Sequence, residues 1–237
     1  MSLWEGTLTD IAFFITGMGR SGTMWLAQLL NESEGVRVYH EALKRGVKIL
    51  EKGHKLNRFA MMSYLEKRKA EMVPPGGQRW GEVNSYLRYW VEPLREAFPD
   101  VPILGLVRDG KEVVASLMRR GVYGSRDRRN LPRPPMDTMD QFAKCCWLWA
   151  DTYERLLEQE VDIFRLEALN ESYSACELLC EELGIEPVGK GTWLKYAGRH
   201  IHTTPKGRRP YAMEWDLGHH SVFKLWAGDI YQEIGYE

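Results

Sequence analysis

The stretch from Gly17 to Thr23 holds the residue types best suited to bind an anion. It reads Gly-Met-Gly-Arg-Ser-Gly-Thr, so three glycines are interleaved with one arginine and two hydroxyl side chains. Glycine lets a backbone approach a ligand closely, the guanidinium adds a fixed positive charge, and hydroxyls add hydrogen-bond donors. We therefore expect this stretch to bind a phosphate or sulfate group.

The residues on either side of this stretch are expected to form a strand and a helix that position it for binding. Residues 11–16 form a short apolar run typical of a buried strand. Met24–Leu30 resumes apolar spacing at Trp25, Leu26, Leu29 and Leu30, which is one face of a helix. A strand–loop–helix order points free backbone N–H groups and the positive end of the helix dipole at one place.

Three interpretations of the glycine pattern compete. Gly17, Gly19 and Gly22 satisfy the dinucleotide fingerprint, with Glu41 standing about where that fingerprint places its ribose-binding acid. Gly17 and Gly22 also fit a nucleotide P-loop, but Thr23 occupies the lysine position, which argues against an ordinary kinase or NTPase. The third interpretation places the cation inside the loop, as Arg20.

A second pair of residues with anion chemistry follows the apolar run Ile103–Val107. Arg108 comes directly after this run, and Ser116 stands eight residues later within the expected helix. An arginine at the carboxyl end of a parallel strand lies at the ligand-binding edge of the sheet, and its planar fork suits a phosphate dianion. The chain thus offers two anion sites at two strand ends.

Together, Arg20-Ser-Gly-Thr23 and the pair Arg108 and Ser116 resemble the sulfotransferases that use 3′-phosphoadenosine 5′-phosphosulfate (PAPS). In that family the first motif is the 5′-phosphosulfate loop, with lysine or arginine at the position of Arg20. The second pair, at this spacing, is its 3′-phosphate site. The resemblance is strong over residues 11–30 and 103–119 and fainter at Glu167 and at the terminal Gly235-Tyr236.

The resemblance implies a set of residues that bind PAPS and its product, 3′,5′-adenosine bisphosphate. Lys206, Arg208 and Arg209 would belong to a late basic loop that closes over the 3′-phosphate, and Trp25 or Trp80 would stack on adenine. The implied phosphate-binding residues of the two motifs are Gly19, Arg20, Ser21, Gly22, Thr23, Met24, Arg108 and Ser116.

Sulfuryl transfer also requires stabilisation of the leaving group and a base for the acceptor. Arg20 is expected to neutralise the leaving 5′-phosphate. Glu41, after the second expected strand, is the candidate base, with His40 as the alternative. The family's cytosolic members place a histidine after the third strand, where this chain has Glu82-Val-Asn84 instead.

Length and composition predict one soluble, cytoplasmic domain over residues 1–237. The net charge of −1 argues against a general nucleic-acid or membrane binder. No apolar run approaches the roughly 20 residues that span a bilayer, and the N-terminus lacks a signal-peptide pattern. The four cysteines form no C-x-x-C pair, so we expect reduced thiols and no metal site.

Strands and helices are expected to alternate, which predicts an α/β fold: a three-layer sandwich with a central parallel sheet. The resemblance to sulfotransferases implies that this sandwich is similar to that of P-loop nucleotide hydrolases. The expected strands are residues 11–16, 35–39, 80–84, 103–107 and 161–166. The expected helices are residues 24–30, 42–72, 86–98, 139–158 and 173–183, with a further helix that begins at residues 108–110 and a final amphipathic segment around residues 222–234.

The leading hypothesis is a PAPS-dependent sulfotransferase with a small-molecule or carbohydrate acceptor carrying a hydroxyl or amine. The alternatives are a P-loop kinase-like phosphotransferase and a nucleotide-binding module without catalytic activity. The polar segment from Gly121 to Asp137, with arginines between Arg126 and Arg133, is expected to be a solvated loop or a lid that grips an anionic acceptor.

Overall fold

In the computed structural model, the description covers residues 11–42, 47–50, 52–69, 71–72, 75–198 and 215–237. Within these ranges the chain forms a sheet of five strands, all paired in parallel, in the order β2-β3-β1-β4-β5. The strands are β1 (Ile11–Gly17), β2 (Val36–His40), β3 (Arg79–Val83), β4 (Ile103–Val107) and β5 (Ile163–Arg165).

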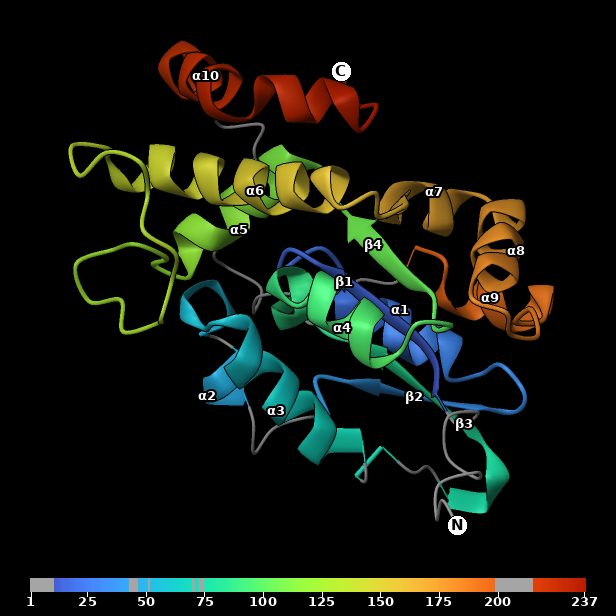
Figure 1. Ribbon diagram of the computed structural model, residues 1–237. Helices are drawn as coiled ribbons and strands as arrows, with labels where there is room; N and C mark the ends of the chain where they lie inside the picture. Colours follow the sequence, from blue (N-terminus) through green and yellow to red (C-terminus); the bar gives the residue numbers. More distant parts are fainter. Residues whose placement is uncertain (1–10, 43–46, 51, 70, 73–74, 199–214) are drawn as a thin grey trace.

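Helices connect the strands and cover the sheet (Figure 1). The α-helices are α1 (Thr23–Leu30), α2 (Val47–Leu50), α3 (Arg58–Lys69), α4 (Val91–Ala97), α5 (Gly110–Arg119), α6 (Gln141–Glu158), α7 (Leu166–Glu171), α8 (Tyr173–Glu182), α9 (Lys190–Tyr196) and α10 (Leu217–Glu233). The described residues also form the short 3₁₀ helices η2 (Gly53–Lys55), η3 (Pro75–Gly77) and η4 (Ser85–Tyr89).

Two apolar clusters lie on opposite faces of the sheet, because successive side chains of a strand alternate between faces. Phe13 and Ile15 of β1 pack in the cluster that contains α1, α8 and α9. Phe14 packs in the other cluster, with α4, α5, α6 and α10. Helix α10 packs against α6 and forms the outermost layer on that side (Figure 1). The result is the predicted sandwich of helices, sheet and helices.

The strand order creates a topological switch point beside β1. The connection after β1 leads through α1 to β2, whereas the connection after β4 leads through α5 and α6 to β5 on the other side of the sheet. Ligands of open parallel sheets bind where neighbouring strands send their connections in opposite directions. The residues that follow Gly17 and Val107 therefore border the expected binding crevice.

The predicted strands are confirmed to within two residues at each end, but two expected helices are wrong in extent. In its described part, the region expected to be helical over 42–72 is divided among α2, η2 and α3. Gly53, the first residue of η2, packs so closely on Trp90 that an added Cβ would lie 2.5 Å from its Nε1, so the chain between α2 and α3 forms a turn against Trp90. The segment 86–98 begins as η4 and continues as α4, with the side chain of Asn84 capping the amide of Tyr86. None of the described helices combines the length and apolar composition needed to cross a membrane.

Candidate functional site

The glycine loop between β1 and α1 is shaped by close approaches and by left-handed backbone. A Cβ on Gly17 would overlap the carbonyl oxygen of Leu106, so the end of β1 lies tight against β4. Gly22 has a φ of 88° at the start of α1, and a Cβ there would lie 2.7 Å from the Leu166 side chain. Arg20 also adopts a positive φ of 83°, a conformation costly for a residue with a Cβ. Strain of this kind concentrates at ligand-binding loops.

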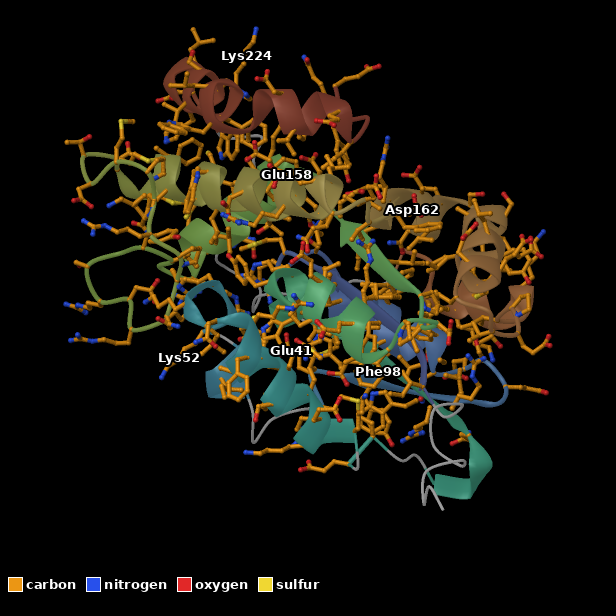
Figure 2. The ribbon with its side chains drawn as sticks, viewed as in Figure 1. Glu41, Lys52, Phe98, Glu158, Asp162 and Lys224 are labelled. Carbon is orange, nitrogen blue, oxygen red and sulfur yellow. The ribbon has the colours of Figure 1, made fainter. Side chains whose placement is uncertain are left out.

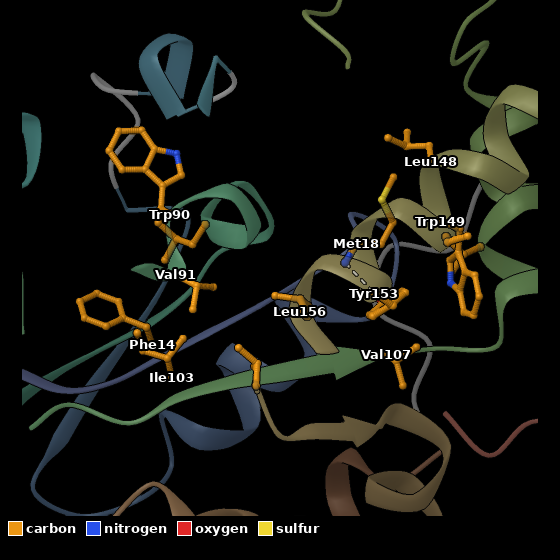
Figure 3. Close-up of a cluster of buried hydrophobic side chains, with 14 of the residues drawn as sticks. Phe14, Met18, Trp90, Val91, Ile103, Val107, Leu148, Trp149, Tyr153 and Leu156 are labelled. Carbon is orange, nitrogen blue, oxygen red and sulfur yellow. Dashed lines mark hydrogen bonds between the residues drawn. The ribbon is translucent and has the colours of Figure 1, made fainter. Parts of the chain in front are cut away.

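Tyr153 of α6 anchors this loop from the interior. Its hydroxyl accepts from the amide of Met18 at 3.2 Å, as Figure 3 shows. The same hydroxyl donates to the carbonyl oxygen of Leu106 at 3.0 Å. Because the phenol proton is used on Leu106, the hydroxyl of Ser21 donates to Tyr153 across 2.9 Å. Ser21 is fully buried, so its side chain fastens the loop to α6. Sequence reasoning missed Tyr153, which looked like one more apolar-face residue of a helix.

Arg20 joins the two expected anion sites. Its Nε donates a hydrogen bond of 3.0 Å to the hydroxyl of Ser116, ninety-six residues further along the chain. Ser116 lies in α5, is 5% exposed, and stands two turns after Arg108. The structure therefore brings the glycine loop and the segment after β4 into direct contact, because β1 and β4 are neighbours in the sheet.

Positive charge gathers around Arg20. Burial lowers the pKa of Arg20, and the guanidinium groups of Arg120, Arg108 and Arg119 lower it further. Arg108 is partly offset by Glu112, whose Oε2 lies 3.5 Å from Nη2 of Arg108. A lowered arginine pKa means that the charged form is opposed by its neighbours. An anion bound among these groups would relieve that repulsion, so the residues present fit a phosphate-bearing ligand.

The turn that carries Arg108 is held by residues from the end of the chain. The amide of Asp109 donates to Oε1 of Glu167 at 3.0 Å, and the hydroxyl of Tyr236 donates to Oε2 of the same carboxylate at 2.7 Å. Tyr231 donates to Oδ1 of Asp109 at 3.2 Å. Glu167 and Tyr236, the two positions of fainter resemblance, thus meet behind Arg108.

A polar chain of contacts follows β2 and reaches the same loop. The hydroxyl of Ser85 donates to Oε1 of Glu41 at 2.9 Å, and Nε2 of His40 lies 4.0 Å from that oxygen. The same Nε2 is 3.0 Å from the hydroxyl of Thr23 at the start of α1. Glu41 has a φ of 51°, another strained position. Figure 2 shows Glu41 in the middle of the molecule, in contrast to Lys52 and Lys224 at its outside.

The carboxyl group of Glu82 lies buried against the turn that carries Glu41. Its Oε1 accepts from the amide of Ala42 at 3.1 Å and from Nδ2 of Asn84 at 2.9 Å. Its Oε2 is buried without a hydrogen-bond partner. Burial raises the pKa of Glu82 to about 7, and the charge of Glu41 raises it further, while the hydrogen bonds act in the opposite direction.

The remaining predicted site residues are placed as follows. Gly19 lies beside Ser85, whose hydroxyl would be 3.7 Å from an added Cβ, and Met24 lies half-buried in the first turn of α1. Trp25 is 3% exposed and donates to the carbonyl of Tyr196, so it belongs to the core. Trp80 is 6% exposed and stacks on Tyr39. Neither ring is open enough to receive adenine. Lys206, Arg208 and Arg209 lie outside the described residues.

All four cysteines are free and buried, as expected from their spacing. In the part of the chain that the structure describes, no three side chains of histidine, cysteine, aspartate or glutamate gather in a way that could hold a metal ion.

Comparison with solved structures shows the same fold in sulfotransferases. Mouse sulfotransferase SULT7A1, complexed with PAP, superposes with a TM-score of 0.54 at 16% identity, covering 95% of this chain and 84% of that one. Sulfotransferase STF9 from Mycobacterium avium gives 0.59 at 14% identity, over 95% and 77% of the two chains. A sulfotransferase from Alicyclobacillus acidocaldarius gives 0.52 at 16% identity, over 96% of each chain. No family model matches this chain, and no curated protein matches its sequence.

The predicted fold class is therefore confirmed: the described residues have the α/β fold of sulfotransferases, built on a central parallel sheet.

Proposed function

We propose that this protein is a sulfotransferase that moves a sulfuryl group from PAPS to a hydroxyl or amine. The hydrogen bond from Arg20 to Ser116 carries the proposal, because it joins the anion cradle after β1 to the arginine and serine after β4. A ligand with phosphate groups at both its 5′ and 3′ positions would use both halves of this arrangement. The PAP bound to the mouse relative is such a molecule and supports the choice.

PAPS, when bound, supplies the sulfuryl group and its leaving phosphate. Arg20 and the amides at the start of α1 would hold the 5′ group, with the helix dipole adding to the attraction. Thr23 would offer a hydroxyl at the same place. Arg108 and Ser116 would hold the 3′-phosphate, Arg108 through its planar fork. Fixed cations of this kind stabilise the negative charge that develops on the leaving oxygen.

Glu41 would act on the acceptor. As the acceptor oxygen or nitrogen forms its bond to sulfur, the bond from sulfur to the leaving phosphate oxygen breaks, and the acceptor proton passes to the Glu41 carboxylate. Ser85 orients that carboxylate through its 2.9 Å hydrogen bond. His40, held 3.0 Å from the hydroxyl of Thr23, connects the acceptor side to the loop. His40 remains the alternative base.

Glu41→Gln tests this assignment, because glutamine keeps an oxygen for Ser85 but cannot accept the acceptor proton. We expect transfer of radiolabelled sulfuryl from PAPS to fall about 10²-fold to 10⁴-fold, the range for loss of a general base. Affinity for 3′,5′-adenosine bisphosphate should change less than about twofold, since Glu41 is not placed at the phosphate groups. The assay would use a panel of sugars, phenols, amines and lipids as acceptors.

His40→Asn and Glu233→Gln are the companion variants, since Glu233 is exposed on α10, far along the chain from the site. Full sulfuryl transfer by Glu41→Gln, together with loss of transfer in His40→Asn, would identify His40 as the base. Absence of transfer by the wild-type protein to every acceptor, with no binding of the bisphosphate, would contradict the proposed function itself.

A further inference from the structure

The segment from Arg119 to Arg133 concentrates positive charge on a chain that is almost neutral. It contains six arginines against the single acid Asp127, whereas the whole chain has a formal net charge of −1. All of its cations are arginine and none is lysine. Arginine is the side chain that recognises carboxylate, sulfate and phosphate groups through a bidentate fork, whereas a merely solvated surface is served equally well by lysine.

Part of this segment lines an open surface hollow, called here the arginine hollow. Its volume is about 450 Å³, within the usual range for ligand sites. The lining residues are Arg120, Gly121, Arg126, Asp127, Arg128 and Arg129.

The one acid of the arginine hollow is committed to folding the loop. Asp127 accepts from the amide of Tyr123 at 2.7 Å, from the amide of Arg129 at 3.0 Å and from Nε of Arg129 at 2.7 Å. Arg129 in turn donates from Nη2 to the carbonyl of Arg120 at 2.7 Å. Among the residues that the structure describes, Arg126 and Arg128 form no ion pair, and both are exposed. Their charge is therefore uncompensated at the rim of a loop that is already ordered.

The arginine hollow adjoins the expected sulfuryl-transfer site. Arg119 and Arg120 stand three and four residues after Ser116, so they lie on the same face of α5 as the hydroxyl that binds Arg20. The same loop reaches toward the segment that follows β2, because Nζ of Lys55 donates to Oδ1 of Asn130 at 2.7 Å. The arginine segment thus extends from the side of β4 toward the side of the sheet where β2 ends at His40, directly before Glu41.

We propose that the arginine hollow binds a sulfate, phosphate or carboxylate group of the acceptor, so that the substrates of this protein already carry negative charge. The inference rests on the proposed function, whose site it extends. The bound group would lie apart from the atom that receives the sulfuryl group, and it would hold the acceptor in place by bidentate contacts from Arg126 and Arg128. An uncharged acceptor of the same size would lack these contacts.

The double variant Arg126→Ala/Arg128→Ala tests the proposal against the control Arg95→Ala/Arg133→Ala, which removes two exposed arginines outside the hollow. Calorimetry would use a chondroitin sulfate tetrasaccharide, glucose 6-phosphate, uncharged maltotetraose and a twelve-residue oligothymidylate. Each ligand would be titrated with and without 3′,5′-adenosine bisphosphate. We expect an anionic sugar to bind the wild-type protein, maltotetraose not to bind, and the hollow variant to lose about tenfold or more of the affinity.

The bisphosphate affinity should stay within about twofold in both double variants. Binding of the tetrasaccharide would identify a polyanionic acceptor, and binding of glucose 6-phosphate a small anionic one. Equal losses of anionic-sugar affinity in the two double variants would show that diffuse positive charge, and not the arginine hollow, attracts the sugar, and this result would overturn the proposal. It would also be overturned by weakened bisphosphate binding in the hollow variant, by tighter binding of the oligothymidylate than of either sugar, or by no binding of an anionic sugar. Because the titrations without bisphosphate do not depend on the nucleotide, they separate this failure from failure of the proposed function.

Discussion

At the scale of single residues, the buried carboxyl group of Glu82 supports the turn that places Glu41. Its carboxyl group is 0% exposed, and one of its oxygens receives the amide of Ala42, the residue directly after Glu41. The other oxygen has no partner. A buried carboxylate with an unpaired oxygen is costly, so the neutral form is favoured until the pH approaches the raised pKa of about 7.

Glu82 should make the protein less stable as the pH rises. The folded-state pKa of about 7 exceeds the ordinary value of 4.5, so folding takes up a proton between these two values. Stability due to Glu82 is then highest below about pH 4.5, falls through the window from 4.5 to 7, and is constant above it. The total loss is on the order of 3 kcal/mol for a shift of this size.

Urea unfolding of the wild type and Glu82→Gln at pH 5, 6, 7 and 8 measures this effect. Glutamine keeps the oxygen that accepts from Ala42 and Asn84, so the difference in unfolding free energy between the two proteins isolates the titration. We expect that difference to shift in favour of the variant as the pH rises to 7. A difference that is independent of pH would contradict the raised pKa.

At the scale of elements, the glycine loop depends on a helix more than a hundred residues away. The hydroxyl of Tyr153 on α6 contacts Met18, Ser21 and Leu106, so it ties the loop after β1 to the end of β4. Those partners are buried, and a lost partner would leave polar groups unpaired in the interior. The anion cradle is thus preorganised by the packing of α6 on the sheet.

Tyr153→Phe should therefore weaken both the fold and the cradle. We expect the unfolding free energy to fall by about 1–3 kcal/mol, the cost of buried groups left without a partner, and bisphosphate affinity to fall roughly tenfold. Tyr173→Phe is the matched control, because it removes a hydrogen bond to the carbonyl of Val188, away from the loop. Urea unfolding of both variants measures the free energy of unfolding, and calorimetry measures the bisphosphate affinity. A Tyr153→Phe protein that is destabilised like the control but binds the bisphosphate normally would show that the anchor does not shape the cradle.

Much of the element pattern could be predicted from the sequence, because it is local. The strands of β1 and β4 are continuous apolar runs, and the glycines and Arg20 stand where the chain turns from strand to helix. The division of the region 42–72 could not be predicted, because the turn at Gly53 packs against Trp90, nearly forty residues away. The strand order and the hydrogen bonds of Tyr153 also depend on tertiary contacts, so they could not be predicted from the periodicity of apolar residues.

The site was predictable to the extent that its motifs lie at strand ends. Arg20 and Ser116 meet because β1 and β4 are neighbours in the sheet, and the hydrogen bond between them joins the two motifs. The adenine platform was not predictable from residue type. Trp25 and Trp80 are aromatic residues near the site in sequence, yet both are buried in the core.

At the scale of the whole molecule, the two halves of the sheet contribute different parts of the candidate site. The β1–β4 boundary gathers Arg20, Arg108 and Ser116, while the ends of β2 and β3 contribute His40 and Glu41 with the supporting Ser85. The cations thus lie at the switch point, and the candidate base lies beside it. This arrangement suits the proposed reaction, in which an anionic donor would lie at the centre of the sheet edge and the acceptor at one side.

Isothermal titration calorimetry with 3′,5′-adenosine bisphosphate, ATP with magnesium, and NAD tests the central claim most directly. The account predicts that the bisphosphate binds the wild-type protein far more tightly than the other two nucleotides. It also predicts that Arg108→Ala reduces this affinity about tenfold to a hundredfold, because a charged contact to the 3′-phosphate is lost. Tighter binding of ATP with magnesium or of NAD, or unchanged bisphosphate affinity in Arg108→Ala, would contradict it.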